Sequence, residues 1–256
     1  MARQENRIDL EAGFVLHSYP YRETSLILDV FTRNHGRLSM VARGARRPTS
    51  VLRGVVQPFQ PLLISWYGKH ELRTLHKLEW VGGHPAHAED GLVCAYYLNE
   101  LLIRFLPKED VNSQTLYDVY AETLRQLAHR APVLPLLRRF ELNLLTELGY
   151  GLSLNATIHG AAVDPGLRYA YRHQVGVLDE ALFDAETDVL LSGQTLRALA
   201  SGQLEDKETK REARLLLREV LQQLLPDNTS LASRELMRRI HELQQRPMPL
   251  SAYPVD

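Results

Sequence analysis

Two patterns of apolar and polar positions divide this chain of 256 residues near residue 80. Before that point, segments rich in leucine, β-branched and aromatic residues alternate with short polar turns. Apolar and polar residues alternate only partly within these segments, as in strands that pack on one face and meet water on the other. The predicted strands cover residues 11–21, 24–32, 36–44, 58–68 and 70–80. So many short strands in about 70 residues predict a small β-barrel.

Beyond residue 81 the apolar positions follow helical spacing. The pattern predicts helices over about 92–105, 113–129 and 133–149, and again over about 193–200, 207–225 and 231–245. Pro135 can lie in the first turn of its helix without loss of a hydrogen bond, and Gly149 suits the left-handed residue that ends it. Between residues 150 and 191 the helical pattern fades, and we expect a compact insert with two or three short strands.

These elements predict an α+β fold: an N-terminal OB-fold β-barrel followed by a mainly α-helical domain with a small irregular β insert. The oligonucleotide-binding (OB) barrel is the most economical choice because it is small and five-stranded, and an SH3-like barrel is the alternative. The expected parts are the barrel (1–80), the first helical part (81–149), the insert (150–191), the second helical part (192–245) and a C-terminal tail (246–256).

Charge sets the barrel apart from the rest of the chain. Residues 1–80 hold twelve Lys and Arg against seven Asp and Glu, whereas the remainder has an acidic surplus. Half of these cations lie in the acid-free stretch 33–53, where glycines and Pro48 break the run into strand, loop and strand. A cationic loop between strands is suited to phosphate contacts, so the stretch favours nucleic-acid binding. The alternative is a hydrophilic turn that touches nothing.

The sequence lacks the common catalytic and metal-binding motifs. It has no phosphate-binding loop, no dinucleotide fingerprint and no nucleophile elbow, which favours a binding protein over an enzyme. His84 and His87 have metal-like spacing but lack further ligands, so we expect no metal and no cofactor. The single cysteine, Cys94, lies in an apolar helical run and suits a buried position. The chain has no membrane-length apolar window and no signal peptide, so we expect a cytoplasmic protein without a membrane partner.

Several segments, taken in order, resemble the RecO family of bacterial recombination mediators. In the barrel they are E-T-S-L at 23–26, V-A-R-G-A-R at 41–46, L-R-G at 52–54 and Q-P-F at 57–59. In the helical part they are Y-x-x-E-L-L at 97–102, L-R-R-F-E-L-x-L-L at 137–145, L-G-Y-G at 148–151 and S-R-E-L at 233–236. The resemblance covers nearly the whole chain.

The resemblance implies a nucleoid-associated repair protein that binds single- and double-stranded DNA and anneals complementary strands. It also implies partners: RecR, the acidic C-terminal tail of the single-stranded DNA-binding protein SSB, and indirectly RecA. A protein adaptor that links SSB and RecR without binding DNA is the alternative, and a metal-independent hydrolase is a remote one. The V-A-R-G-A-R match supplies candidate phosphate contacts, which are Arg43, Arg46 and Arg47, followed by Arg37 and Arg53.

Aromatic side chains near these arginines are candidates for base stacking, which contributes about 1–3 kcal/mol per base. We expect Phe31 and Phe59 to fill the barrel instead. Trp66 and Tyr67 are candidate DNA contacts, with packing in the barrel as the alternative.

The helical match suggests a second site. Arg138 and Arg139, set among leucines, are candidates to hold the acids of an SSB tail, with ordinary surface arginines as the alternative. Many RecO relatives carry a four-cysteine zinc site after the L-G-x-G segment, but this insert has no cysteine. His159 and His173 alone do not replace those ligands, so we expect packing to hold this degenerate zinc-finger-like region.

Overall fold

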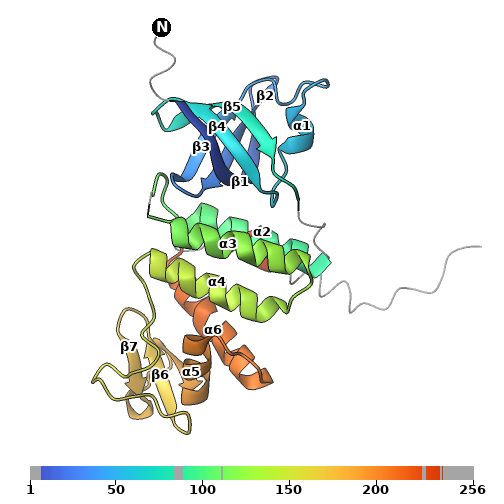
Figure 1. Ribbon diagram of the computed structural model, residues 1–256. Coiled ribbons are helices and arrows are strands. Elements are labelled where there is room, and N and C mark those ends of the chain that lie inside the picture. Colours follow the sequence, from blue (N-terminus) through green and yellow to red (C-terminus); the bar gives the residue numbers. More distant parts are fainter. Residues whose placement is uncertain (1–6, 84–88, 111, 227–228, 237, 239–256) are drawn as a thin grey trace, which may run out of the picture.

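The computed structural model of the protein describes residues 7–83, 89–110, 112–226, 229–236 and 238. Figure 1 shows its parts stacked along one axis. A β-barrel stands at one end, antiparallel helices cross the middle, and a small sheet with further helices lies at the other end. The α+β class predicted from the sequence is confirmed.

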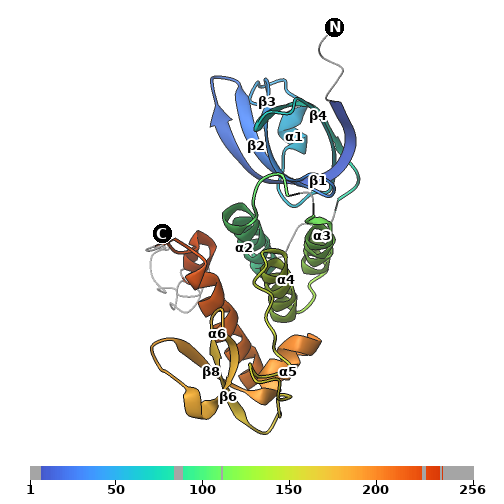
Figure 2. The same cartoon turned by 90° about the vertical axis from the view of Figure 1, so that its left-hand side faces the viewer.

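The N-terminal strands form a closed barrel in the order β1-β2-β3-β5-β4. Their bounds are β1 Arg7–Tyr21, β2 Ser25–Thr32, β3 Gly36–Ala42, β4 Leu62–Tyr67 and β5 Leu72–Trp80. Neighbouring strands are antiparallel, except that β3 and β5 are parallel. Figure 2 looks into the ring that the strands make. This topology confirms the OB-type barrel, and the SH3-like alternative is set aside.

The long strand β1 closes the barrel because it pairs with both β2 and β4. Its register shifts between Val15 and His17 on the β2 side, and between Ile8 and Glu11 on the β4 side. Such bulges bend a strand and increase its twist, which lets one strand serve two edges of a curved sheet.

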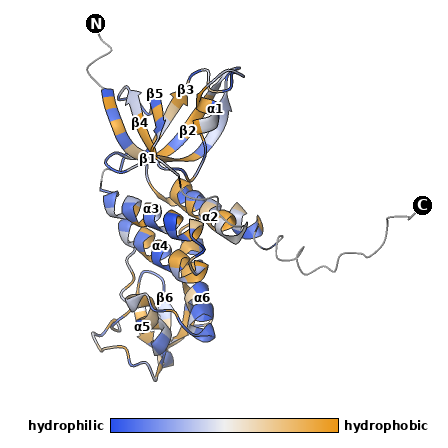
Figure 3. Ribbon diagram, turned by 45° about the vertical axis from the view of Figure 1, so that its right-hand side comes forward, coloured by the Kyte–Doolittle hydropathy of each residue, from blue (hydrophilic) through white to orange (hydrophobic). Residues whose placement is uncertain are grey.

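Alternate residues of these strands point into the barrel, and hydrophilic and hydrophobic bands follow one another along β1 in Figure 3. Trp66 is the bulkiest of the enclosed side chains, with 2% of its surface exposed. Phe31 and Phe59 are buried elsewhere. The Phe31 ring lies 5.4 Å from the ring of Tyr117, and the Phe59 ring lies 4.9 Å from that of Tyr96, both on helices. The expectation that these phenylalanines fill the barrel is therefore wrong, because they belong to the core shared with the helical part.

Polar contacts fix the barrel on helices α2 (Glu89–Phe105) and α3 (Gln114–Ala128). The side-chain amide of Asn99 donates to the backbone oxygen of Leu16 at 2.8 Å, and the Tyr120 hydroxyl donates to the amide oxygen of Asn99 at 2.5 Å. All of these groups are buried, so each would cost stability without its partner. At the rim, Arg33 donates two hydrogen bonds of 2.9 Å to the carboxylate of Asp118.

The start of β3 touches the loop between α2 and α3. Gly36 has a positive φ of 64°, and a Cβ atom at this position would lie 2.3 Å from the backbone oxygen of Asp110. The next residue, Arg37, donates from Nε to the backbone oxygen of Leu106 at 2.9 Å, and its own carbonyl accepts from the Glu109 amide at 2.9 Å. One strand of the barrel is thus tied directly to the helical part.

Helix α4 (Val133–Glu147) packs beside α2 and α3. Pro135 lies in its first turn as predicted, and Gly149 follows its end with a positive φ of 81°. The predicted helices near the C-terminus are α5 (Gly193–Ser201) and α6 (Lys207–Gln223). Of the last predicted helix, residues 232–236 are helical, and most of the remainder lies outside the described residues.

The insert forms a small antiparallel sheet in the order β7-β6-β8. Its strands are β6 (Arg168–Arg172), β7 (Gly176–Asp179) and β8 (Asp188–Ser192). Arg172 on β6 donates to both carboxylate oxygens of Asp188 on β8, at 2.7 and 2.9 Å, and these bonds lower the pKa of Asp188 to about 2. On the other side, the buried carboxylate of Glu212 on α6 accepts from Ser192 and Thr195. Side-chain contacts therefore hold the sheet against α6.

The described residues contain no group of three or more His, Cys, Asp and Glu side chains placed to hold a metal ion. His84 and His87 lie outside the described residues, as does the predicted C-terminal tail. Cys94 is buried in α2, as expected. Within the part of the chain that the structure describes, no helix is long and apolar enough to cross a membrane.

Candidate nucleic-acid interface

The arginine-rich stretch leaves the barrel where β3 ends. After Ala42 the chain makes a series of turns and then forms the short helix α1 (Leu52–Val55) before it returns in β4. Gly44 has a positive φ of 68°, which lets the chain reverse, and the Arg47 amide donates to its carbonyl at 3.1 Å. Arg53 thus lies on a short helix, where the sequence pattern predicted strand.

This loop is bonded to the turn that joins β1 and β2. The backbone amide of Arg46 donates to the carbonyl of Thr24 at 2.8 Å. The guanidinium of the same residue donates to the carbonyl of Arg22 at 3.2 Å. Two segments that lie about twenty residues apart in the sequence are therefore held side by side.

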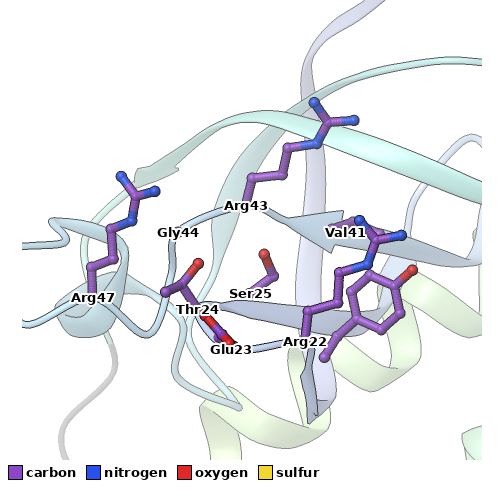
Figure 4. Close-up of a pocket in the computed structure, with 9 residues that line it drawn as sticks. Arg22, Glu23, Thr24, Ser25, Val41, Arg43, Gly44 and Arg47 are labelled. Atoms are coloured by element: carbon purple, nitrogen blue, oxygen red, sulfur yellow. The ribbon is translucent and has the colours of Figure 1, made fainter.

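The loop and the turn enclose a hollow of about 780 Å³. Figure 4 shows Arg22 rising from the turn, and Arg43 and Arg47 from the loop, to the same side of it, with the Thr24 and Ser25 hydroxyls between them. OB barrels commonly bind oligonucleotides across strands 2 and 3 beside the loop between strands 1 and 2, which is where this hollow lies. Its lining consists of Tyr21, Arg22, Glu23, Thr24, Ser25, Val41, Arg43, Gly44 and Arg47.

No ion pair between described residues neutralises the arginines of this hollow. Among the described residues, neither Arg22, Arg43 nor Arg47 has an ion-pair partner, and all three side chains are exposed. Glu23 is the acidic residue of the lining, and in the part of the chain that the structure describes no ion pair joins it to these guanidinium groups. Clustered cations that keep their charge free can attract and hold a polyanion.

Arg53 lines a second hollow, of about 350 Å³. That hollow is lined by Ser18, Leu26, Ala45, Arg46, Arg53 and Val56. Arg46 lines this second hollow and is also bonded to the turn beside the larger one, so the two hollows lie near each other.

Arg37 lies away from these hollows, near the start of β3, whereas the loop that carries Arg43 and Arg47 follows the end of that strand. Its guanidinium donates to Leu106 at the other end of β3, and partial burial lowers the pKa of Arg37. The structure therefore does not bring Arg37 together with the other candidate arginines.

The two candidate stacking residues, Trp66 and Tyr67, have different environments. Trp66 cannot stack on a base because it is enclosed in the barrel core, so this prediction is wrong. Tyr67, the next residue along β4, points outward and is partly exposed. Its ring lies 4.9 Å from that of His76, and its hydroxyl accepts a long hydrogen bond of 3.5 Å from Arg7. The ring is thus already engaged by neighbours on the outer face.

Arg138, a candidate of the second predicted site, is engaged within the helical part. Arg138 is buried, and its guanidinium donates to the carboxylate of Glu141 at 2.7 Å. The Tyr97 hydroxyl donates to the same carboxylate oxygen, also at 2.7 Å. Burial raises the pKa of Glu141, and the charges of Arg138, Arg234 and Arg214 oppose that rise. Several guanidinium groups therefore surround one buried acid.

Arg139 faces a different neighbour. It is exposed, and its charge acts on Glu122 of α3 and lowers that residue's pKa, to which Arg125 and Gln126 contribute more. Consecutive positions on a helix lie about 100° apart, so Arg138 and Arg139 cannot both face one pocket. The expectation that these two arginines flank a common site is not supported by the geometry.

Sequence comparisons relate both parts of the chain to one protein family. Residues 9–84 match the family described as recombination protein O N terminal, and residues 90–234 match recombination protein O C terminal. The chain is 45% identical to DNA repair protein RecO of Thiobacillus denitrificans over 93% of its own length and 94% of that protein. It is 45% identical to the RecO protein of Aromatoleum aromaticum, with 94% and 99% coverage, and 46% identical to that of Burkholderia orbicola, with 90% and 82%.

Proposed function

The chain belongs to the RecO family of DNA repair proteins, and from that premise we propose that it acts as a DNA-binding recombination mediator. It binds single- and double-stranded DNA through the cationic surface around Arg43 and Arg47, and it anneals complementary strands. Together with RecR it helps RecA to load on strands that SSB covers. The observation that supports this proposal is the group of unpaired guanidinium side chains that share one side of the hollow.

Binding of this kind is directed at the sugar-phosphate backbone. Guanidinium groups pair with phosphate oxygens, which carry no sequence information, so we expect similar affinities for unrelated oligonucleotides. The affinity should fall steeply as salt rises because each neutralised phosphate releases condensed counterions.

The arginines of the loop provide the direct test. A charge-assisted hydrogen bond contributes roughly 1.5–3 kcal/mol, so Arg43→Ala and Arg47→Ala should each weaken binding of a labelled single strand by about tenfold or more. Fluorescence anisotropy at 100 mM salt measures the change. Arg197→Ala is the matched control, because Arg197 is an exposed arginine on α5, at the opposite end of the molecule from the barrel (Figure 1).

Two outcomes would contradict the proposal. If the wild-type chain bound no oligonucleotide at low salt, while RecR and an SSB tail still bound, the protein would be an adaptor that does not bind DNA. If the loop variants bound DNA as tightly as wild type and as Arg197→Ala, the interface would lie elsewhere.

Recruitment of SSB is a second part of the proposal, and it concerns the helical part. An acidic tail that ends in phenylalanine needs cations beside an apolar surface. Arg214 on α6 is exposed, adjoins the exposed Leu215, and contributes to the positive surroundings of Glu141. We therefore place the tail on the side of α4 that Arg138 faces.

A peptide experiment separates the two sides of α4. Arg214→Ala should weaken binding of a synthetic acidic peptide with a terminal phenylalanine by about tenfold, on the same basis of one lost charge-assisted contact. Oligonucleotide binding should not change. If Arg139→Ala weakens the peptide and Arg214→Ala does not, the tail binds on the α3 side instead.

A further inference from the structure

Arg22 lies outside the arginine-rich stretch, in the turn between β1 and β2. It has a positive φ of 51°, which is a costly conformation for a residue with a side chain. Backbone strain of this kind persists where the surroundings impose it, and it is common at ligand sites. The conformation directs the Arg22 side chain into the hollow that Arg43 and Arg47 also face (Figure 4).

The Arg22 guanidinium is placed by an aromatic ring. It lies over the ring of Tyr21, 5.2 Å from its centroid, which is within the range of a cation–π contact. This contact holds the side chain in position while leaving its N–H donors available for another group. Arg22 therefore has the position and the free donors of a phosphate contact.

Arg46 has a different environment. Its backbone amide holds the carbonyl of Thr24 and its guanidinium holds the carbonyl of Arg22. These bonds span the β1–β2 turn and stabilise the conformation that carries Arg22. Arg46 does not line the hollow that Arg22, Arg43 and Arg47 share.

From these contacts, and on the basis of the proposed DNA-binding function, we infer that Arg22 is a third phosphate contact and that Arg46 is a positioning residue. Arg22, Arg43 and Arg47 hold the phosphates of a strand, with the Thr24 and Ser25 hydroxyls as further donors. Arg46 acts through Arg22, because it fixes the turn in the conformation that aims the Arg22 guanidinium at the strand.

Salt dependence distinguishes a contact from a positioning residue. For a single strand, each phosphate contact makes the fall of log K with log salt steeper by about 0.7. Anisotropy between 50 and 300 mM salt measures this slope. Arg22→Ala should make the slope shallower by about 0.7 and weaken binding by about tenfold at 100 mM. Arg197→Ala should leave both quantities at their wild-type values.

The role of Arg46 is tested with the double variant. If Arg46 acts only through Arg22, then Arg46→Ala added to Arg22→Ala should change the affinity by less than about twofold and leave the slope unchanged, since residues that act as a unit are not additive. Arg46→Ala alone should weaken binding, with a smaller effect than Arg22→Ala. Thermal melting of each variant checks that the barrel remains folded.

Each result decides one part of the inference. An unchanged slope in Arg22→Ala, while Arg43→Ala lowers it, would show that Arg22 does not contact phosphate. If the slope of the double variant became shallower by about a further 0.7, Arg46 would itself contact a phosphate. Absence of DNA binding by the wild-type chain would instead remove the proposed function itself, so the two failures are distinguishable.

Discussion

Glu141→Ala is expected to lower the free energy of unfolding by about 3–5 kcal/mol. The substitution leaves the guanidinium of Arg138 buried without its partner, and it also removes the acceptor of the Tyr97 hydroxyl. An uncompensated charge in the protein interior costs more than the original pair contributed, because its hydration is lost without replacement.

Another Glu–Arg pair, on the neighbouring helix α3, provides the control. Glu122 and Arg125 have the same spacing of three residues and a similar distance of 2.6 Å, but both side chains are exposed. Loss of an exposed helical pair costs about 0.3–0.5 kcal/mol, so Glu122→Ala should change stability little. Urea denaturation of both variants measures the difference. Similar small effects would show that Glu141 and Arg138 are not enclosed in solution.

This prediction also affects functional experiments. Arg138→Ala leaves Glu141 without its main partner, so a loss of SSB-tail binding in that variant would follow from local unfolding alone. Substitutions of exposed arginines, such as Arg214 and Arg139, are the appropriate probes of this surface.

Gly36→Ala is expected to cost about 2–5 kcal/mol. A left-handed conformation costs a residue with a side chain about 1–2 kcal/mol, and overpacking typically adds about 1–3 kcal/mol. The added carbon would meet the backbone of Asp110, and a main chain held by its own hydrogen bonds cannot turn aside as a flexible side chain can. Thermal and urea unfolding of the intact chain measure the loss.

Two other glycines separate these contributions. Gly68 also has a positive φ, of 97°, but an added Cβ would meet no atom within 4 Å, so Gly68→Ala reports the conformational cost alone. Gly54 has neither constraint and lies in α1, where alanine favours the helix by about 1 kcal/mol. A cost at Gly36 no larger than that at Gly68 would mean that the barrel and the α2–α3 loop are not in close contact.

The barrel could be predicted because its strands leave a direct pattern in the sequence. Alternation along each strand shows that a face is buried, but it does not identify what covers the opposite face. Phe31 illustrates the difference: it is as apolar as the residues inside the barrel, yet it faces the helices. A contact between distant parts of the chain determined its position, and such contacts leave no local pattern.

The candidate site was predicted in part for the same reason. The loop arginines were evident from their density, whereas Arg22 is a single cation that stands just before the E-T-S-L match at 23–26. The usual role of the first loop of an OB barrel could have identified it. Trp66 and Tyr67 could also have been separated beforehand, because successive strand residues point to opposite faces.

Buried acids were the least predictable feature. Glu212 lies among charged residues on α6, so its neighbours in the sequence do not indicate that it is buried. It is enclosed, because the hydroxyl groups of Ser192, at the end of β8, and Thr195, on α5, donate to its carboxylate. Leu215 shows the converse, since this apolar residue of the same helix is exposed.

Strand β3 connects the helical part to the loop that carries Arg43, and this connection has a mechanical consequence. Its first residues are anchored to the helical part through Gly36 and Arg37, and the loop that follows its last residue carries Arg43 to the hollow. In the proposed binding mode, a force applied at the hollow along the axis of β3 would be resisted by the helical part, to which the start of the strand is anchored. A lengthwise pull loads every backbone pair between β3 and β2 at once, from Gly36 to Ala42, whereas a sideways pull would peel them apart one by one. Against a load in that direction, the pairing of β3 with β2 would resist in shear.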